Sequence, residues 1–503
     1  MDKKRLSINL VANIVSFGIS TLLSFFLTPF LVRYLGKEIY GFYGIANNFV
    51  SFITVIAVAL NSMAAKYITV ELVRGNNIKA NQYYASIFIS NLILCVLLLP
   101  VLTITVFEID KILTISPKYL IDIQILFSLV FLAMIIRFLT LIFGSATYSS
   151  NRMDIRAYIE IAKSFLRLLL YFSIFYFFKP SIIYVGLVLF LLEAFNSGIQ
   201  ISIAKKLLPG MSLGPRWYNR TLVTKTFKVG IWNSINQLGD LLINSTSLII
   251  SNIFLGEMAS GSVSIVKTMP LLLSGVITAI NGVFMPRVAH MYAIKDKSKL
   301  ILEVINSQKF IGFVLSPISV ILVVYGKDFF NLWVPGNNST LLMQLSIFEI
   351  LKMVFVGISL PILNLNIVID KVKVPSIYML ISGFINIIFM VLLLKYTKLQ
   401  IFSIFLATFL VTFSLYGIII PNYTSHLFKI SPKVFFRVIT ITIFNISLIF
   451  LVTKVIYSFS NITSWGDFLL STIFSGFIGY MISVLTFFGP KKIKYYVSKV
   501  LEQ

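Results

Sequence analysis

Residues 8–32, INLVANIVSFGISTLLSFFLTPFLV, contain no charged side chain over 25 positions. About 20 apolar residues cross the roughly 30 Å hydrocarbon core as a helix, which pairs its own backbone polar groups. The preceding Lys3-Lys4-Arg5 is typical of a signal peptide, but the apolar run is too long and ends without a small-residue cleavage site. The stretch therefore predicts an uncleaved first membrane span.

Similar apolar runs recur along all 503 residues. Fourteen spans are predicted, at residues 8–32, 39–64, 83–107, 119–144, 157–178, 181–203, 229–255, 262–286, 310–326, 340–369, 375–394, 400–420, 438–457 and 466–488. Only Lys179-Pro180-Ser181 separates the fifth span from the sixth, and the ninth is short, so twelve or thirteen spans remain an alternative. The expected fold is an all-α polytopic membrane protein.

The composition agrees with this prediction, with 58% hydrophobic and 12% charged residues and a mean hydropathy of +0.94. Soluble domains average about 25% charged residues, so a soluble enzyme head on one anchor is excluded, as is disorder. The net charge of +24 must lie in loops, where it favours anionic lipids and an anionic substrate over nucleic acid. One cysteine and two histidines exclude a disulfide framework and predict no metal site.

The loops differ in charge. Most of the 42 Lys and Arg residues fall in the N-terminal arm, the even-numbered loops and the C-terminal tail. The positive-inside rule therefore predicts that both termini are cytoplasmic. The longest connections, residues 204–228 and 287–309, are then also cytoplasmic, and no outer loop is large enough for a catalytic domain.

An internal repeat is visible at one constant offset along the chain. Leu35-Gly36-x4-Gly41-x3-Ile45 recurs as Leu255-Gly256-x4-Gly261-x3-Ile265, Ala59-x-Asn61 recurs as Ala279-x-Asn281, and Asn13 matches Asn233. The offset spans six predicted helices, as in transporters built from two parallel halves. We expect an N-lobe at 1–203, a basic linker at 204–228, a C-lobe at 229–420, and two extra spans with a basic tail at 421–503.

Ionisable residues inside the predicted spans are the main functional candidates, because each costs a few kcal/mol in a bilayer. They are Arg137, Glu160, Lys163, Arg167, Glu193, Asp240, Lys267, Glu349 and Lys352. No Walker A sequence, dinucleotide fingerprint or zinc pattern accompanies them, so the sequence predicts no enzyme and no ATP-driven motor.

These charges have two interpretations. Glu160, Lys163 and Arg167 share one helical face, which is either an ion ladder along the helix or the basic wall of a cavity. Glu349 and Lys352, three residues apart, are expected to neutralise each other.

The other four, Arg137, Glu193, Asp240 and Lys267, need a partner on another helix or contact with water. Either they form interhelical salt bridges or they bind substrate, and Glu193 and Asp240 are also candidates for H⁺ or Na⁺ coupling. Polar residues crowd the first helix of each predicted lobe, including Asn13 and, in the second lobe, Asn233 and Gln237. They either join helices or line a hydrophilic cavity.

Several short motifs resemble the polysaccharide transporter family, the Wzx-type repeat-unit flippases, within the exporter superfamily that also holds multidrug antiporters and peptidoglycan lipid flippases. The motifs are Arg33-Tyr34-Leu35-Gly36-x3-Tyr40-Gly41, Lys66-Tyr67-Ile68, Phe284-Met285-Pro286-Arg287, and Asn364-Leu365-Asn366 ahead of Asp370-Lys371-Val372-Lys373. The resemblance extends over nearly the whole chain.

The resemblance implies a flippase in the bacterial cytoplasmic membrane that exports undecaprenyl-diphosphate-linked oligosaccharide repeat units, of capsule or O-antigen type, by alternating access. In related lipid flippases a basic residue stands as far before the proline closing the eighth span as Lys267 stands before Pro286. Expected partners are this lipid, anionic membrane lipids, a polysaccharide polymerase and chain-length proteins. No cofactor is expected, since the membrane potential contributes about 2.3 kcal/mol per charge per 100 mV.

The expected substrate-binding residues combine the resemblance with the polar and basic positions above. They are Lys267, Arg137, Arg167, Arg33, Lys66, Asn13, Asn61, Asn233, Gln237 and Asn281. Two other functions stay open at this point. One is a multidrug cation antiporter on the same fold, and the other is a membrane-bound polysaccharide polymerase.

Overall fold

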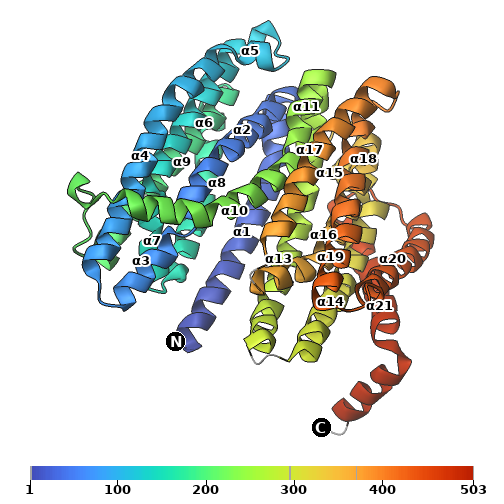
Figure 1. Ribbon diagram of the computed structural model, residues 1–503. Coiled ribbons are helices and arrows are strands. Elements are labelled where there is room, and N and C mark those ends of the chain that lie inside the picture. The colour runs from blue at the N-terminus through green and yellow to red at the C-terminus, as the bar shows by residue number, and fades with distance from the viewer. Residues whose placement is uncertain (1–2, 294–295, 370, 502–503) are drawn as a thin grey trace. The chain divides into compact units, whose positions relative to one another are not determined.

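The computed structural model describes residues 3–293, 296–369 and 371–501, which form helices joined by short turns (Figure 1). In chain order the elements are α1 (Lys3–Leu35), α2 (Lys37–Asn61), α3 (Ala64–Val73), α4 (Asn77–Phe107), α5 (Ile109–Ile112), η1 (Pro117–Tyr119), α6 (Leu120–Thr140), η2 (Leu141–Gly144), α7 (Ser145–Ser149), α8 (Met153–Phe177), α9 (Ile182–Leu207), η3 (Pro215–Trp217), α10 (Arg220–Asn244), α11 (Thr246–Leu255), α12 (Glu257–Val266), α13 (Thr268–Ala293), α14 (Lys297–Val324), α15 (Gly326–Trp333), α16 (Ser339–Val368), α17 (Lys373–Tyr396), α18 (Ile401–Thr412), η4 (Phe413–Ile419), α19 (Ile420–Phe428), α20 (Lys433–Ser458) and α21 (Trp465–Leu501). The predicted all-α polytopic membrane fold is confirmed.

Thirteen helical segments among the described residues are long and apolar enough to cross a membrane. Of the fourteen predicted spans, the one at 157–178 does not meet this composition, although it forms the 25-residue helix α8. Even its last eighteen residues hold Glu160, Lys163 and Arg167. A 25-residue helix is about 37 Å long, so α8 has the length of a span and differs only in its charge.

Side-chain caps explain where several long helices begin, because the first backbone N–H groups of a helix lack partners within it. At the starts of five helices a side-chain oxygen of the cap residue accepts a hydrogen bond from such an N–H. The cap residues are Asn76 for α4, Ser181 for α9, Asn219 for α10, Asp296 for α14 and Asn338 for α16. The Lys299 backbone N–H also lowers the pKa of the Asp296 carboxyl.

Several predicted spans are interrupted helices. The second span divides into α2 and α3, the seventh into α10 and α11 at Ser245, and the eighth into α12 and α13 at Lys267. Interrupted helices free backbone polar groups, which must find partners in the protein or in a wetted cavity. The breaks are therefore the places along these spans where polar side chains are needed.

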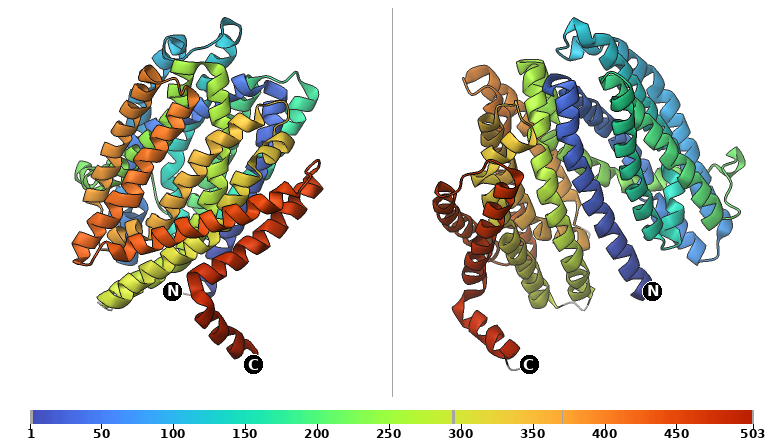
Figure 2. Two further views of the ribbon diagram at one scale, coloured as in Figure 1. Left: turned by 90° about the vertical axis from the view of Figure 1, so that its right-hand side faces the viewer. Right: turned by 180° about the vertical axis from the view of Figure 1, so that it is seen from behind.

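The chain packs as two compact units. The first contains residues 1–264 and 379–387, and the second contains 265–378 and 388–503. In the first unit α1 packs on α8, α6 on α9, and α2 on α10 (Figure 1). In the second unit α14 packs on α13, α16, α20 and α21 (Figure 2). The division into lobes at residues 204–228 stays a prediction.

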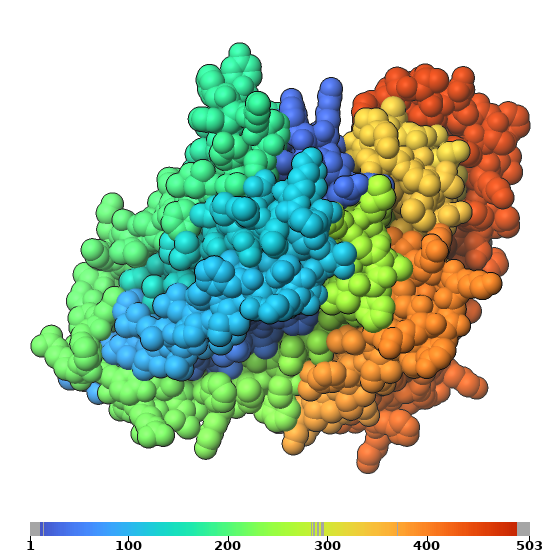
Figure 3. Space-filling model, turned by 90° about the horizontal axis from the view of Figure 1, so that it is seen from above, coloured from blue at the N-terminus to red at the C-terminus, as the bar shows by residue number. Residues whose placement is uncertain are grey.

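Apolar side chains cover the outer face of α4 in the first unit. Leu92, Val96 and Ile104 are exposed there. In Figure 3, viewed from above, the light-blue chain around α4 lies on the surface. A helix with exposed apolar residues on one face suits contact with lipid chains rather than with water.

The predicted linker is anchored to α4. The Asn81 amide donates to the Ser212 hydroxyl (3.3 Å), and the Ser212 N–H donates to the Asn81 Oδ1 (2.7 Å). The Asn219 N–H donates to the Ser86 hydroxyl at 2.8 Å. Residues from Arg220 onward already belong to α10, so the last part of the expected linker is helix.

The internal repeat has a structural counterpart in the first unit. Gly36 and Gly256, which the repeat aligns, both have positive φ, 82° and 84°, and each precedes a helix. The aligned Gly41 and Gly261 pack against each other, since a Cβ on Gly41 would lie 2.8 Å from the Gly261 N. Both copies therefore use glycine at these positions for a backbone reason.

Candidate functional site

A polar cavity of about 600 Å³ lies within the first unit. Its walls come from the second half of α2, the end of α6, α7, the start of α8, the middle of α9, and α10. Ligand sites commonly have volumes of about 300–1,000 Å³. Of the predicted site residues, the structure brings Asn61, Arg137, Glu193 and Gln237 together here.

Two guanidinium groups give the cavity a cationic side. Arg137 stands in the last turn of α6 and Arg156 in the first turn of α8, and both line the cavity. Neither forms an ion pair with any residue that the structure describes. The salt bridge between Arg137 and Glu193 or Asp240, considered from the sequence, is not formed in the described chain.

Two neighbouring cations are instead neutralised by acids of their own helix or its cap. Lys163 lies 3.0 Å from the Glu160 carboxylate, as the ion-ladder interpretation predicts, and both residues also line the cavity. Arg152 donates from Nε to the Asp154 Oδ1 at 3.0 Å, and this hydrogen bond raises the pKa of Arg152. Arg137 and Arg156 are therefore the cavity cations best able to bind an anion.

A row of hydrogen-bonding side chains on α9 forms another wall. Glu193, Asn196 and Gln200 share one helical face, and all three line the cavity. The Asn196 amide donates to the Glu193 carboxylate at 3.1 Å, and the Gln200 amide donates to the Asn196 carbonyl oxygen at 3.1 Å. The row can offer both donors and acceptors to a ligand with many hydroxyl groups.

Asn61 is held in place beside the cavity. Its amide exchanges two hydrogen bonds with the Asn91 amide of α4, at 2.9 and 3.1 Å. Its Nδ2 also donates to the Ala57 carbonyl at 2.9 Å. Asn61 is thus a fixed polar wall residue at the end of α2.

The remaining predicted residues of the first unit do not line this cavity. Arg167 donates a hydrogen bond to the Ser24 hydroxyl of α1 at 2.7 Å. The predicted ion ladder on α8 therefore consists of Glu160 and Lys163 without Arg167. Arg33 and Lys66 are exposed at helix ends, and Asp240 accepts a hydrogen bond from the Asn244 amide. Asn13 lies exposed on α1, and Asn233 lies half-buried on α10.

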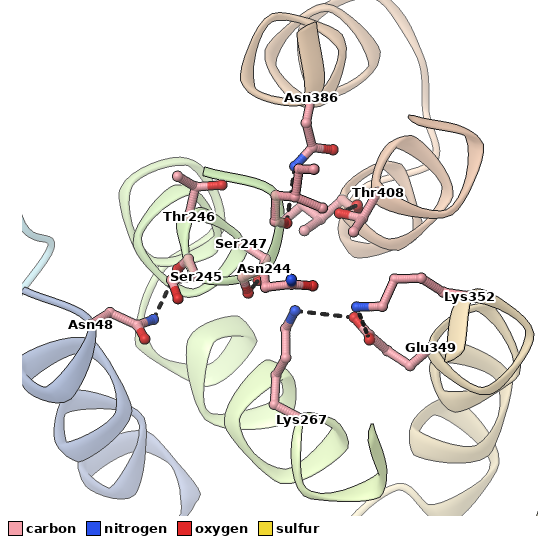
Figure 4. A network of polar contacts seen from close by, with 12 residues as sticks. Asn48, Asn244, Ser245, Thr246, Ser247, Lys267, Glu349, Lys352, Asn386 and Thr408 are labelled. Atoms are coloured by element: carbon pink, nitrogen blue, oxygen red, sulfur yellow. Dashed lines mark hydrogen bonds and ion pairs between the residues drawn. The ribbon is translucent and has the colours of Figure 1, made fainter. Parts of the chain in front are cut away.

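The second unit contains a buried ionic cluster of Lys267, Glu349 and Lys352 (Figure 4). The Lys267 Nζ lies 3.1 Å from the Glu349 carboxylate, which also pairs with Lys352. The Glu349 side chain is 2% exposed and that of Lys267 17%. The expected Glu349–Lys352 pair is confirmed, and Lys267 also forms the interhelical salt bridge considered from the sequence.

Asn281 belongs to the second unit as well. Its amide donates to the Ile277 carbonyl at 2.9 Å, and its Oδ1 accepts from the Asn364 amide at 3.4 Å. A binding role for Lys267 or Asn281 stays a prediction.

Two asparagines of the first unit donate hydrogen bonds to backbone carbonyl groups at the break between α10 and α11 (Figure 4). The Asn48 amide donates to the Ser245 carbonyl at 2.8 Å, and the Asn386 amide donates to the Leu242 and Ile243 carbonyls at 3.2 and 3.1 Å. These amides replace helical partners that the break removes. Both amides therefore stabilise the break between α10 and α11.

The sequence interpretation missed three cavity residues, Arg156, Asn196 and Gln200. Arg156 is one turn before Glu160, so the charged face of α8 begins one turn earlier than predicted. Asn196 and Gln200 follow Glu193 at helical spacing. Continuing each polar face by one or two turns in both directions would have found all three.

No protein-family model matches the chain. Over 472 residues the chain is 26% identical to the uncharacterized membrane protein EpsK of Bacillus subtilis (strain 168), and the match covers 93% of each protein.

Solved structures show the fold more clearly. An inward-facing multidrug resistance MATE family transporter of the MOP superfamily superposes with a TM-score of 0.71 at 14% identity, covering 84% of this chain and 97% of that one. The lipid II flippase MurJ, in an inward closed conformation, superposes with a TM-score of 0.68 at 17% identity, covering 94% and 98%. The chain therefore has the fold of these multi-pass transporters.

Proposed function

We propose that this protein is a flippase that moves an undecaprenyl-diphosphate-linked oligosaccharide, of capsule or O-antigen type, from the inner to the outer leaflet by alternating access. The observation that carries the proposal is the cavity of the first unit, which combines Arg137 and Arg156 with a row of amides. The likeness of the fold to the lipid II flippase MurJ supports the same class of substrate.

The chemistry of the cavity suits such a lipid. Sugars and a diphosphate cannot cross hydrocarbon unaided, because each unpaired polar group costs several kcal/mol there. A guanidinium group binds phosphate oxygens with two parallel hydrogen bonds. Gln200 and Gln237 supply amides that match sugar hydroxyls.

The role of Lys267 in this proposal depends on its ion pair with Glu349. The resemblance to lipid flippases implies that Lys267 binds the diphosphate, but its ammonium group lies 3.1 Å from the Glu349 carboxylate. A phosphate could bind Lys267 only by sharing or displacing this carboxylate. The primary anion-binding role therefore goes to Arg137 and Arg156.

The membrane potential supplies a driving force for export. With the cytoplasm negative, each negative charge that moves outward gains about 2.3 kcal/mol per 100 mV. A dianionic headgroup would gain about twice this amount. Transport then requires no coupled ion, although Glu193 in the cavity would allow one.

A multidrug cation antiporter is the second candidate function. Glu160 and Glu193 line the cavity, and a carboxylate in a polar cavity can bind a cation. The likeness to the MATE family transporter supports this alternative. Arg137 and Arg156 oppose it, because two guanidinium groups without an acidic partner among the described residues repel a cationic drug.

The test begins with cells depleted of the protein, in which a membrane-impermeant label reports the leaflet of the lipid-linked oligosaccharide. The flippase proposal expects complete units to accumulate on the cytoplasmic leaflet. Single units on the outer leaflet would identify a later step, such as polymerisation. Normal distribution of the lipid, with sensitivity to cationic drugs, would favour the antiporter.

Two substitutions then test the cavity. Arg137→Ala with Arg156→Ala should lower export at least tenfold at normal protein level, because a hydrogen bond to a charged group contributes about 1.5–3 kcal/mol. Arg74→Ala is the matched control, since this arginine is 69% exposed and pairs with Glu71 outside the cavity. Equal export by the double variant and the control would contradict the assignment.

A further inference from the structure

A pair of reciprocal hydrogen bonds joins the loop after α5 to the last turn of α11 in the first unit. The Thr114 N–H donates to the Asn252 Oδ1 at 2.9 Å, and the Asn252 amide donates back to the Thr114 carbonyl at 3.3 Å. Thr114 follows α5, and Asn252 lies near the end of α11. Asn252 is fully buried, so this amide is committed to the contact.

A second pair of hydrogen bonds lies beside the first. Both the N–H and the hydroxyl of Ser116 donate to the Glu257 carboxylate, the hydroxyl at 3.0 Å. Glu257 is the first residue of α12. We call these four residues, Thr114, Ser116, Asn252 and Glu257, the clasp.

The turn that carries half of the clasp contains a glycine hinge. Gly256 stands between Asn252 and Glu257 with φ of 84°. Nothing lies within 4 Å of the position of a Cβ on Gly256. The turn is therefore held by the clasp and by backbone geometry rather than by tight packing at this residue.

The clasp and the cavity lie toward opposite ends of the first unit. The start of α2 is next to α12, because a Cβ on Gly261 would lie 2.1 Å from the Lys37 carbonyl oxygen. The cavity residue nearest that end of α2 is Thr54, which is about 26 Å along the helix at 1.5 Å per residue. Along α6, Arg137 is about as far from Leu120, which follows the clasp loop.

We propose that the clasp is the gate that closes the outer end of this transporter. The inference rests on the proposed function, because a flippase that alternates access must open the end remote from its loaded cavity. Under the expected topology the loop at 108–118 and the turn at Gly256 both face the outside. Opening the gate separates Thr114 and Ser116 from Asn252 and Glu257.

The chemistry of the clasp suits reversible opening. Its bonds join polar groups that water can solvate once the loops part, so no large apolar surface must be exposed. Thr114 is already exposed in the closed form. An apolar contact of the same size would lack replacement partners in the open form.

The first test measures gate opening without any substrate. Lys111 and Met258 are exposed on either side of the clasp and accept spin labels through Lys111→Cys and Met258→Cys. A Cys95→Ala background removes the one native cysteine. In vesicles of phosphatidylethanolamine and phosphatidylglycerol, Asn252→Ala should raise the long-distance population at least threefold.

Asn81→Ala is the matched control for this measurement. Asn81 is also buried and also exchanges two hydrogen bonds with a loop, at Ser212. Both substitutions should lower thermal stability, but only Asn252→Ala should change the label distances. Unchanged distances in Asn252→Ala, or an equal change in Asn81→Ala, would overturn the gate.

The second test locks the gate. Ser116→Cys and Glu257→Cys place two thiols where the Ser116 hydroxyl and the Glu257 carboxylate now meet. The disulfide should reduce export of the saccharide lipid to background, and reduction should restore it. Full export by the locked protein would overturn the gate and leave the flippase proposal standing. Absence of saccharide-lipid export by the protein that keeps Ser116 and Glu257, together with the expected label distances, would count against the substrate and not the gate.

Discussion

Glu349 forms ion pairs with two lysines, Lys267 and Lys352, at a buried position. Its side chain is 2% exposed, and the paired side chain of Lys352 is 4% exposed. Removing one member of a buried ionic cluster leaves the others without compensation, which costs about 3–5 kcal/mol. Glu349→Gln should therefore markedly lower the thermal unfolding midpoint of the detergent-solubilised protein, measured by tryptophan fluorescence.

Lys299→Met provides the comparison for this substitution. Lys299 lies 3.1 Å from Asp296, as Lys267 does from Glu349, but its side chain is 66% exposed. Exposed ion pairs contribute about 0–1 kcal/mol, so this variant should unfold near the parent temperature. A Glu349→Gln protein as stable as the Lys299→Met protein would show that the cluster is hydrated.

At single positions the sequence could predict which residues are unusual but not which partner each one takes. The Glu349–Lys352 pair followed from helical spacing. Lys267 and Arg137 looked alike, as cations without a partner on their own helix, yet Lys267 pairs with Glu349 and Arg137 faces the cavity. Contacts between helices depend on packing angles and breaks, which the spacing of charges does not encode.

Helix α10 depends on glycine where it crosses α2. A Cβ on Gly230 would lie 2.1 Å from the Ala59 carbonyl oxygen, so Gly230→Ala must push the two helices apart. Overpacking of this kind costs about 1–3 kcal/mol. The variant should therefore show a lower unfolding midpoint and a smaller folded fraction on size-exclusion chromatography.

Gly198 on α9 provides the control, because it tests whether the loss of stability in Gly230→Ala comes from the close contact between α2 and α10. Nothing lies within 4 Å of a Cβ on Gly198, so Gly198→Ala should be neutral or stabilising by up to about 1 kcal/mol. If both alanine variants behave alike, close approach of α2 and α10 is not needed for folding.

Helix positions along the chain were largely predictable, because apolar runs of span length leave few alternatives. The positions at which these helices break were not predictable. Ser245 and Lys267 interrupt helices within runs that read as continuous spans, and the partners that stabilise the first break, Asn48 and Asn386, are distant in sequence. Helix α8 differs from these, because it is an unbroken helix of span length whose charged residues make it too polar to meet the composition of a membrane span.

At the level of the whole molecule, the two compact units differ from the two halves that the repeat suggests. The first unit takes in α10, α11 and most of α12, together with residues 379–387 of α17. Gly239 of α10 explains part of this, because a Cβ there would lie 2.6 Å from the backbone of Met379. Repeats in a sequence report common origin, whereas compact units report packing, and the two need not coincide.

The repeat makes its own prediction through Gly36 and Gly256. Their φ and ψ angles, 82° and 154° for one and 84° and −174° for the other, fall in a region that is nearly restricted to glycine. At both positions the space that a Cβ would occupy is free of other atoms within 4 Å, so the cost of alanine comes from the backbone alone, about 1–3 kcal/mol. Gly36→Ala and Gly256→Ala should therefore lower the unfolding midpoint by similar amounts, whereas Gly18→Ala, in an open helical position, should not. A loss in only one of the two variants would mean that the aligned turns do not carry equivalent strain, and the structural argument for the repeat would then rest on Gly41 and Gly261 alone.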